Sequence, residues 1–332
     1  MRRRSPSELS RRAFLAALPA AAALLSCRGQ SPGSPLVDVP QTSAVGLFAA
    51  PHYGVDLADV IFRGLLELGP SVRGRRVFLK PNLVEYGRDT AINTHPAVVA
   101  GAAAAFLRAG ASEVKVGEGP GHRRDIEYLL GASGLRECLA DARLSFVDLN
   151  HDDVHRTRLR TRFMGFDELL LPVTLLQSDF VVSLPKLKTH HWAGMTAGMK
   201  NLFGVVPGAV YGWPKNVLHV AGIDNAILDL VATVRPQFTI VDGIVAMEGD
   251  GPIMGRPRPL GIVAMGADPV AVDATCARTI GLDPGKIPYL ARASGVLGNG
   301  DERRIEQRGE KLSRYRTRFE VIARLNHLRL DG

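Results

Sequence analysis

The feature that most constrains this chain is a regular alternation, from residue 44 onward, of short apolar runs with longer helix-like segments. The apolar runs are typical of buried strands and fall at residues 76–82, 113–119, 144–150, 178–186, 238–245 and 260–266. Helical periodicity falls between them at residues 97–111, 125–135, 220–235 and 268–280. This order is typical of βαβ units. It predicts an α/β fold with a mainly parallel, doubly wound sheet and helices on both faces.

The composition is consistent with one large domain. Of the 332 residues, 46% are hydrophobic and 22% are charged, which argues against general disorder. No run of eighteen apolar residues occurs, so the sequence excludes a multi-span membrane protein. We expect residues 43–332 to form a single α/β domain.

The first 27 residues have the pattern of an export signal. Five arginines precede an apolar segment at residues 13–26, and Pro19 inside that segment disfavours a core helix. Residues 10–15, SRRAFL, resemble a twin-arginine signal. Residues 24–27, LLSC, resemble a lipobox.

In that motif Cys27 would be lipidated and become the mature N-terminus. A competing cleavage after Ala23 would instead release a soluble periplasmic protein. Residues 28–42 are rich in Pro, Ser, Gly and Gln and are expected to form a flexible tether. The sequence therefore predicts an exported protein, periplasmic or in the cell envelope, lipid-anchored through Cys27.

Much of the basic excess belongs to the signal. Without residues 1–27 the chain keeps 36 basic and 32 acidic residues, a net charge of +4. This balance disfavours nucleic-acid binding, and we expect membrane contact only through the lipidated N-terminus.

The three cysteines are too far apart to make a metal centre on their own. Cys27, Cys138 and Cys276 lack the spacing of a four-thiolate zinc site or an iron–sulfur cluster. Cys138 and Cys276 lie in helix-like segments, so we expect inert buried thiols rather than a disulfide.

Polar residues gather where the predicted strands end. The carboxyl ends of parallel strands share one edge of a sheet, and ligands bind there. The side chains suited to bind an anion are ammonium, amide and hydroxyl groups, those of Lys80, Asn82, Lys186, Lys188, Thr189, Lys200 and Asn201. Carboxylates suited to a divalent metal are Glu118, Asp242 and Glu248, with Asp250 beside them. The alternative is that these lysines and carboxylates pair with one another.

Three of these residues are candidates for catalysis. Glu118 and Asp242 could serve as bases or metal ligands, and His190 could transfer a proton. His191 follows directly, so on an extended chain at most one of the two histidines would face the site. Met195, Met199 and Leu202 form a helical stripe that indicates packing. Thr94 is expected to cap the helix that Pro96 opens.

Named catalytic motifs do not occur in the sequence. It contains no GxGxxG, no Walker A pattern, no GxSxG elbow and no HExxH zinc motif.

A family resemblance rests on several short motifs taken in order. They are Lys80-Pro81-Asn82, Gly117-Glu118-Gly119, Pro185-Lys186-x-Lys188-Thr189-His190, Gly198-Met199-Lys200-Asn201, Asp242-Gly243 and Asp268-Pro269-Val270-Ala271-x-Asp273. Over residues 45–320 the chain resembles the family catalogued as domain of unknown function 362. The resemblance implies an α/β fold and an association with iron–sulfur proteins. It supplies no residue of known role, and this chain lacks the CxxCxxC run of some members. A more distant similarity to the N-terminal domain of nickel-dependent lactate racemase is a fold-level analogy.

Two hypotheses of function follow. The first is an enzyme that acts on a small anionic substrate, with a divalent metal as a candidate cofactor. The second is a non-catalytic binding or accessory protein that works beside a redox or cell-envelope partner.

Overall fold

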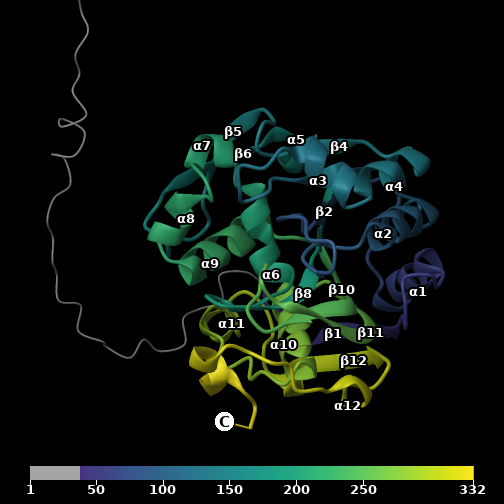
Figure 1. Ribbon diagram of the computed structural model, residues 1–332, viewed down its shortest axis with the longest axis vertical. Helices are drawn as coiled ribbons and strands as arrows, with labels where there is room; N and C mark the ends of the chain where they lie inside the picture. The colour runs from purple at the N-terminus through teal and green to yellow at the C-terminus, as the bar shows by residue number, and fades with distance from the viewer. Residues whose placement is uncertain (1–37, 332) are drawn as a thin grey trace, which may run out of the picture. The chain divides into compact units, whose positions relative to one another are not determined.

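The structure is a computed structural model that describes residues 38–331, so the predicted signal and Cys27 lie outside the described residues. Its main sheet has ten strands (Figure 1). Along the sheet the order is β12-β1-β11-β10-β7-β2-β3-β4, with β8 paired to β10 and β9 to β8. The strands are β1 (Ser43–Ala49), β2 (Arg76–Pro81), β3 (Glu113–Glu118), β4 (Phe146–Asp148), β7 (Phe180–Leu184), β8 (Lys186–His190), β9 (Gly194–Thr196), β10 (Phe238–Glu248), β11 (Arg256–Gly266) and β12 (Ile305–Gly309). A separate hairpin pairs β5 (Val154–Arg158) with β6 (Glu168–Pro172).

The central strands are parallel, which confirms the predicted α/β class. β4, β3, β2, β7 and β10 pair in parallel, whereas β11 runs antiparallel to both β10 and β1. The carboxyl ends of β2, β3 and β7 therefore lie at one edge of the sheet.

Helices cover both faces of the sheet. The helices are α1 (Leu57–Leu68), α2 (Pro96–Arg108), α3 (Ile126–Ala132), α4 (Leu135–Asp141), α5 (Val173–Leu176), α6 (Gly198–Asn201), η1 (Leu202–Val205), α7 (Gly208–Tyr211), α8 (Asn216–Val220), α9 (Ile223–Val234), α10 (Pro269–Thr279), α11 (Pro288–Ala293), η2 (Glu302–Arg304), α12 (Leu312–Tyr315) and η3 (Ala323–Leu328). Figure 1 shows α1 and α2 on one side of the sheet and α6, α9 and α10 on the other.

Successive side chains of β2 point alternately into the hydrophobic clusters on the two faces of the sheet. Val77 and Leu79 belong to the hydrophobic cluster that contains α1 and α2, whereas Phe78 belongs to the cluster that contains α9 and α10. A strand that is buried on both faces must be apolar along most of its length. Lys80 follows directly in this strand and is also fully buried, so its charge requires a partner inside the protein.

The segment at residues 187–218, which lies between the predicted strand at residues 178–186 and the predicted helix at residues 220–235, is largely structured. It holds most of β8, then β9, α6, η1, α7 and more than half of α8. β8 has the two-residue alternation of a strand, but the residues on one of its faces are Lys186, Lys188 and His190, and all three are buried. A strand is normally recognised in a sequence by apolar residues on its buried face. Because β8 has charged and polar residues there, its pattern does not predict a strand.

The start of α2 also differs from the prediction. His95, not Thr94, is its N-cap, and the His95 Nδ1 accepts a hydrogen bond from the Ala97 amide. The Thr94 hydroxyl instead donates to the Leu184 carbonyl at 2.6 Å and accepts from the Asn82 amide at 2.8 Å. Thr94 therefore ties the ends of β2 and β7 together.

Other expectations about individual side chains are confirmed. Met195, Met199 and Leu202 are fully buried in the core. Cys138 on α4 and Cys276 on α10 are free thiols, as expected, but Cys276 is buried whereas Cys138 is only half-buried. Among the described residues, no helix is both long enough and apolar enough to cross a membrane.

The short helix α6, which carries two predicted site residues, is held at its N-terminus by a buried carboxylate. Asp273 on α10 accepts hydrogen bonds from the Gly198 amide at 2.7 Å and the Met199 amide at 3.1 Å. Burial raises the pKa of Asp273 to about 7, against the opposing effect of these two amides.

We predict that Asp273 makes stability fall with rising pH. The carboxyl loses its proton in the unfolded chain near pH 4 but keeps it in the folded protein until about pH 7. The free energy of unfolding, measured by urea denaturation relative to Asp273→Asn, should therefore fall by roughly 2–4 kcal/mol between these pH values. The variant is the reference because its amide does not titrate. A difference that stays constant across this pH range would contradict the prediction.

Candidate functional site

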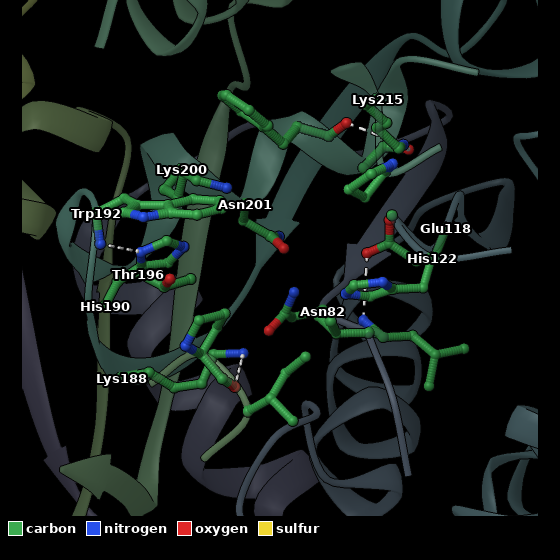
Figure 2. Close-up of a pocket in the computed structure, with 18 of the residues that line it drawn as sticks. Asn82, Glu118, His122, Lys188, His190, Trp192, Thr196, Lys200, Asn201 and Lys215 are labelled. Atoms are coloured by element: carbon green, nitrogen blue, oxygen red, sulfur yellow. Dashed lines mark hydrogen bonds between the residues drawn. The ribbon is translucent and has the colours of Figure 1, made fainter. Parts of the chain in front are cut away.

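A cavity of about 340 Å³ opens at the carboxyl ends of β2 and β3 and beside β8 and α6. Figure 2 shows Lys188, His190 and Lys200 on one side of it, Glu118 and His122 on the other, and Asn82 between them. The edge of the sheet predicted to bind a ligand therefore carries a cavity.

Lys80 and Glu118 form a buried ion pair beneath this cavity. The Lys80 ammonium hydrogen-bonds Glu118 Oε2, and both side chains are almost completely inaccessible. Glu118 also accepts from the Gly119 amide at 2.9 Å and the Leu83 amide at 3.3 Å. A carboxylate that is already occupied by an ammonium and two amides is poorly placed to act as a base.

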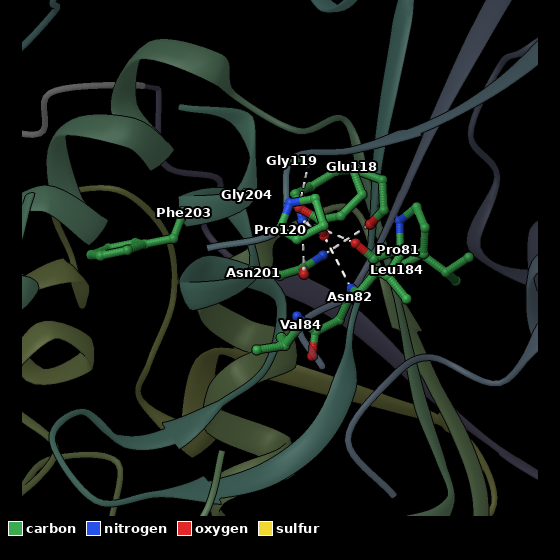
Figure 3. Close-up of polar contacts among 12 residues, drawn as sticks. Pro81, Asn82, Val84, Glu118, Gly119, Pro120, Leu184, Asn201, Phe203 and Gly204 are labelled. Atoms are coloured by element: carbon green, nitrogen blue, oxygen red, sulfur yellow. Dashed lines mark hydrogen bonds and ion pairs between the residues drawn. The ribbon is translucent and has the colours of Figure 1, made fainter. Parts of the chain in front are cut away.

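Asn201 completes this cluster. Its Oδ1 accepts from the Lys80 ammonium at 3.1 Å, and its Nδ2 donates to the Lys80 carbonyl at 2.9 Å and the Ser183 hydroxyl at 3.1 Å. Figure 3 shows Glu118, Asn201 and Gly204 gathered at this point. Asn201 lines the cavity, but its amide group is engaged in holding Lys80.

A second buried pair lies outside the residues that line the cavity. The Lys186 ammonium donates to Asp242 Oδ2 at 2.5 Å and to the Tyr53 hydroxyl at 2.7 Å. Asp242 also accepts from the His95 amide at 3.0 Å, and the Tyr53 and His95 rings are stacked at 3.7 Å. The structure therefore places Asp242 and Lys186 in a separate polar cluster, where they hold the start of α2 against β10.

The three carboxylates proposed as metal ligands are each bound to a different partner. Glu118 is paired with Lys80, Asp242 with Lys186, and Glu248 with Arg256 at 3.1 Å. Within residues 38–331, no group of three or more His, Cys, Asp and Glu side chains is arranged to hold a metal ion. The sequence indicated these carboxylates but could not show that each is paired with a cation, because the partners are far apart along the chain.

Lys188 is a buried lysine that forms no salt bridge with a carboxylate of the described residues. Its side chain is 0% exposed, lines the cavity, and donates to the Ile92 carbonyl at 2.8 Å. Burial, and then the neighbouring ammonium of Lys200, lowers the pKa of Lys188 well below its ordinary value. An anion in the cavity would oppose both effects.

Lys200 presents a second cation to the cavity. Its ammonium lies 3.7 Å from the centre of the Phe203 ring, and no hydrogen bond from it to another described residue is found. Burial and the nearby Lys80 lower the pKa of Lys200 to about 7.

His190 adds a neutral hydrogen-bond donor. Its Nδ1 accepts from the Trp192 amide at 3.1 Å and the Ala193 amide at 3.2 Å, so the hydrogen of the neutral ring is on Nε2, on the cavity side (Figure 2). Burial, and then Lys200, lowers the pKa of His190 well below its ordinary value, which keeps the ring neutral.

His191 also lines the cavity, so the expectation that only one of the two histidines would face it is wrong. The chain turns immediately after β8 instead of continuing extended, and this turn brings both rings to the same side. The His191 Nδ1 lies 3.1 Å from Asp250.

Lys215 lines the cavity, but its ammonium group is already hydrogen-bonded within the protein. Its ammonium contacts four carbonyl oxygens, those of Gly119, Phe203, Gly204 and Val206, at 2.5–3.2 Å. Burial lowers the pKa of Lys215 to about 7, whereas this set of carbonyl acceptors favours the charged form. Lys215 therefore fastens the loops after β3 and α6 to each other.

The walls of the cavity are apolar. They include Leu83, Val84, Phe203 and Ile253. Trp192 and Met254 also line it, although their side chains are 58% and 78% exposed, which places them at its mouth.

The cavity thus contains part of the predicted site together with residues that the sequence did not indicate. The predicted residues that line it are Asn82, Glu118, Lys188, His190, Lys200 and Asn201. Those that do not line it are Lys80, Lys186, Thr189, Asp242 and Glu248. Thr189 is buried and donates to the Gly249 carbonyl at 2.9 Å. The unpredicted members include His122, Trp192, Lys215 and His219, which lie in loops or short helices without a recognised motif.

Fold and site together define an α/β protein with a cationic, apolar-walled cavity at its strand ends. The chain belongs to the family described as Domain of unknown function (DUF362), whose pattern matches residues 77–278. It is 33% identical over 262 residues to the thylakoid-associated protein sll1697 of Synechocystis sp., a match that covers 75% of this chain and 78% of that protein.

Solved structures give weaker matches. The lactate racemase apoprotein from Thermoanaerobacterium thermosaccharolyticum aligns with a TM-score of 0.47 and 12% identity over 74% of this chain. A Thermotoga maritima protein aligns with a TM-score of 0.36 and 15% identity over 66% of this chain. The chain spans 59% and 57% of the lengths of these two proteins.

We predict that Gly204→Ala disrupts the buried Lys80–Glu118 pair. A Cβ at Gly204 would overlap Glu118 Oε1 and the end of the Lys80 side chain, neither of which has free space to move into. The free energy of unfolding in urea should fall by roughly 2–4 kcal/mol. Gly121→Ala is the matched control, because a Cβ there meets nothing within 4 Å. Equal stability of the two variants would contradict the prediction.

Proposed function

We propose that this protein binds a small organic anion, a carboxylate with an apolar body, in the cavity at the carboxyl ends of its strands. The observation that carries the proposal is the presence of Lys188 and Lys200 at a cavity whose single lining carboxylate, Glu118, is already paired with Lys80. A bound carboxylate would be the negatively charged partner for these two ammonium groups.

The electrostatics favour an anion over a metal ion. Buried charges are costly unless paired, and burial lowers the pKa of both Lys188 and Lys200 in the absence of a partner. The Nε2–H of His190 adds a donor, and none of the other cavity-lining side chains adds a carboxylate. A cation would meet repulsion here.

The apolar walls favour an organic acid over a free phosphate. Leu83, Val84, Phe203 and Ile253 offer no hydrogen-bonding side-chain groups to replace the water around a phosphate dianion. Burial of an apolar ring or alkyl chain against the same walls is favourable. Benzoate is therefore a suitable probe, and inorganic phosphate is its counterpart.

We predict that benzoate binding weakens as pH rises. Lys200 has a pKa of about 7 in the empty protein, and a bound carboxylate would raise it, so binding takes up a proton above pH 7. The dissociation constant for benzoate, measured by calorimetric titration, should be about tenfold larger at pH 8 than at pH 6. Lys200→Met should remove most of this pH dependence and weaken binding at pH 6.

Lys311→Met is the matched control, because Lys311 is exposed and far from the cavity lining. Phosphate should bind more weakly than benzoate to the wild-type protein. If benzoate does not bind, or if Lys311→Met weakens it as much as Lys200→Met does, the proposed function is wrong.

Catalysis in the same cavity is a second candidate. The observation that favours it is Lys200, since an amine with a pKa of about 7 can accept a proton at neutral pH, as a general base does. Chemical conversion of the bound acid would distinguish an enzyme from a binding protein, with or without a redox or cell-envelope partner.

We further propose that residues 1–27 direct export and that Cys27 carries a lipid anchor. The basic and apolar segments and the LLSC motif support this. Cys27→Ala should release the protein from the membrane fraction into the soluble fraction, as followed by immunoblotting. Arg2→Lys is the control, because it keeps the charge and leaves the motifs at residues 10–15 and 24–27 unchanged. Membrane retention of Cys27→Ala would refute the anchor.

A further inference from the structure

Asn82 presents an unsatisfied hydrogen-bond acceptor to the cavity. Its side chain is 9% exposed, it lines the cavity, and none of the described residues donates a hydrogen bond to its Oδ1. Figure 2 shows the amide group projecting between Lys188 and Glu118. Buried side-chain oxygens in folded proteins normally have a partner, so this one calls for an explanation.

The backbone of Asn82 is fixed while its side-chain amide is left unengaged. The Asn82 amide donates to the Thr94 hydroxyl at 2.8 Å, and the Asn82 carbonyl accepts from the Thr94 amide at 2.9 Å. Thr94 in turn donates to the Leu184 carbonyl at 2.6 Å. The backbone of Asn82 is therefore held in place, and none of the described residues supplies a donor to its side-chain oxygen.

The nearby ammonium groups of Lys188 and Lys80 already donate hydrogen bonds to other acceptors. Lys188 already donates to the Ile92 carbonyl, and the Lys80 ammonium is engaged by Glu118, Asn201 and the Pro81 carbonyl. The Asn82 Oδ1 atom is itself buried and has no donor among the described residues. Because Lys200 faces the cavity as a partner for the ligand carboxylate, a donor group on the ligand is the partner left for Oδ1.

We propose that Asn82 is a specificity-determining residue that accepts a hydrogen bond from a neutral donor, a hydroxyl or an N–H group, carried by the anionic ligand. This inference rests on the proposed function, since it assumes an organic carboxylate in the cavity. It narrows the ligand to a carboxylic acid with an apolar body and a separate hydrogen-bond donor.

The experiment compares acids that differ only in that donor. Calorimetric titration measures the affinity of the purified protein for benzoate, for the three hydroxybenzoate isomers and for the three methoxybenzoates. A methoxy group occupies the position of the hydroxyl but cannot donate. The best hydroxybenzoate should bind about three- to tenfold more tightly than its methoxy counterpart.

Variants at Asn82 assign this preference to its oxygen. Asn82→Leu, which is similar in size, should remove the preference and still bind benzoate. Asn82→Asp should retain the preference while weakening all the acids, because its carboxylate accepts a hydrogen bond but repels anions. Asn216→Leu is the matched control at an exposed position outside the cavity, and it should change neither quantity.

The outcomes separate the two levels of the proposal. Equal binding of hydroxy and methoxy acids, or a hydroxyl preference that survives in Asn82→Leu, overturns the role of Asn82 and leaves the organic-anion site intact. Failure of every one of these acids to bind overturns the site and this inference together.

Discussion

The arrangement of the site depends on which of the buried lysines near the carboxyl ends of the strands are paired with carboxylates. Lys80 and Lys186 are both fully or nearly fully buried, and each is paired with one carboxylate, Glu118 or Asp242. Buried ions must be paired or pay a large desolvation cost, so each of these carboxylates is already neutralised by its own lysine. Within residues 38–331, Lys188 and Lys200 are left without a carboxylate partner. The anionic character of the proposed ligand follows from this imbalance.

The two ion pairs have different structural consequences. The Lys80–Glu118 pair, with Asn201, joins the ends of β2 and β3 to α6 and forms the floor beneath the cavity. The Lys186–Asp242 pair, with Tyr53 and the His95 amide, fastens α2 to β10 away from the cavity. One supports the binding site, and the other supports a helix that packs on the sheet. Both pairs match the alternative that the sequence had left open, namely mutual pairing of lysines and carboxylates.

Much of the candidate site could be predicted because parallel strands bring their carboxyl ends to one edge. Asn82, Glu118, Lys188 and His190 were indicated by this rule and line the cavity. The rule could not say which charges would be neutralised, because pairing depends on side-chain distances across strands that are far apart in sequence. It also missed Lys215 and His219, which lie in a segment without a recognised motif and reach the cavity through the turns around α7 and α8.

By itself, the sequence determined the α/β class, the positions of most of the main strands and helices, though not of β1 or α1, and the edge of the sheet where polar residues gather. These follow from local periodicity, which depends on neighbouring residues alone. The tertiary structure decided that β8 is a strand, that both His190 and His191 line the cavity, and that Lys188 is a buried cation without a carboxylate partner. Such features depend on which distant residues meet, and a one-dimensional pattern does not contain those distances.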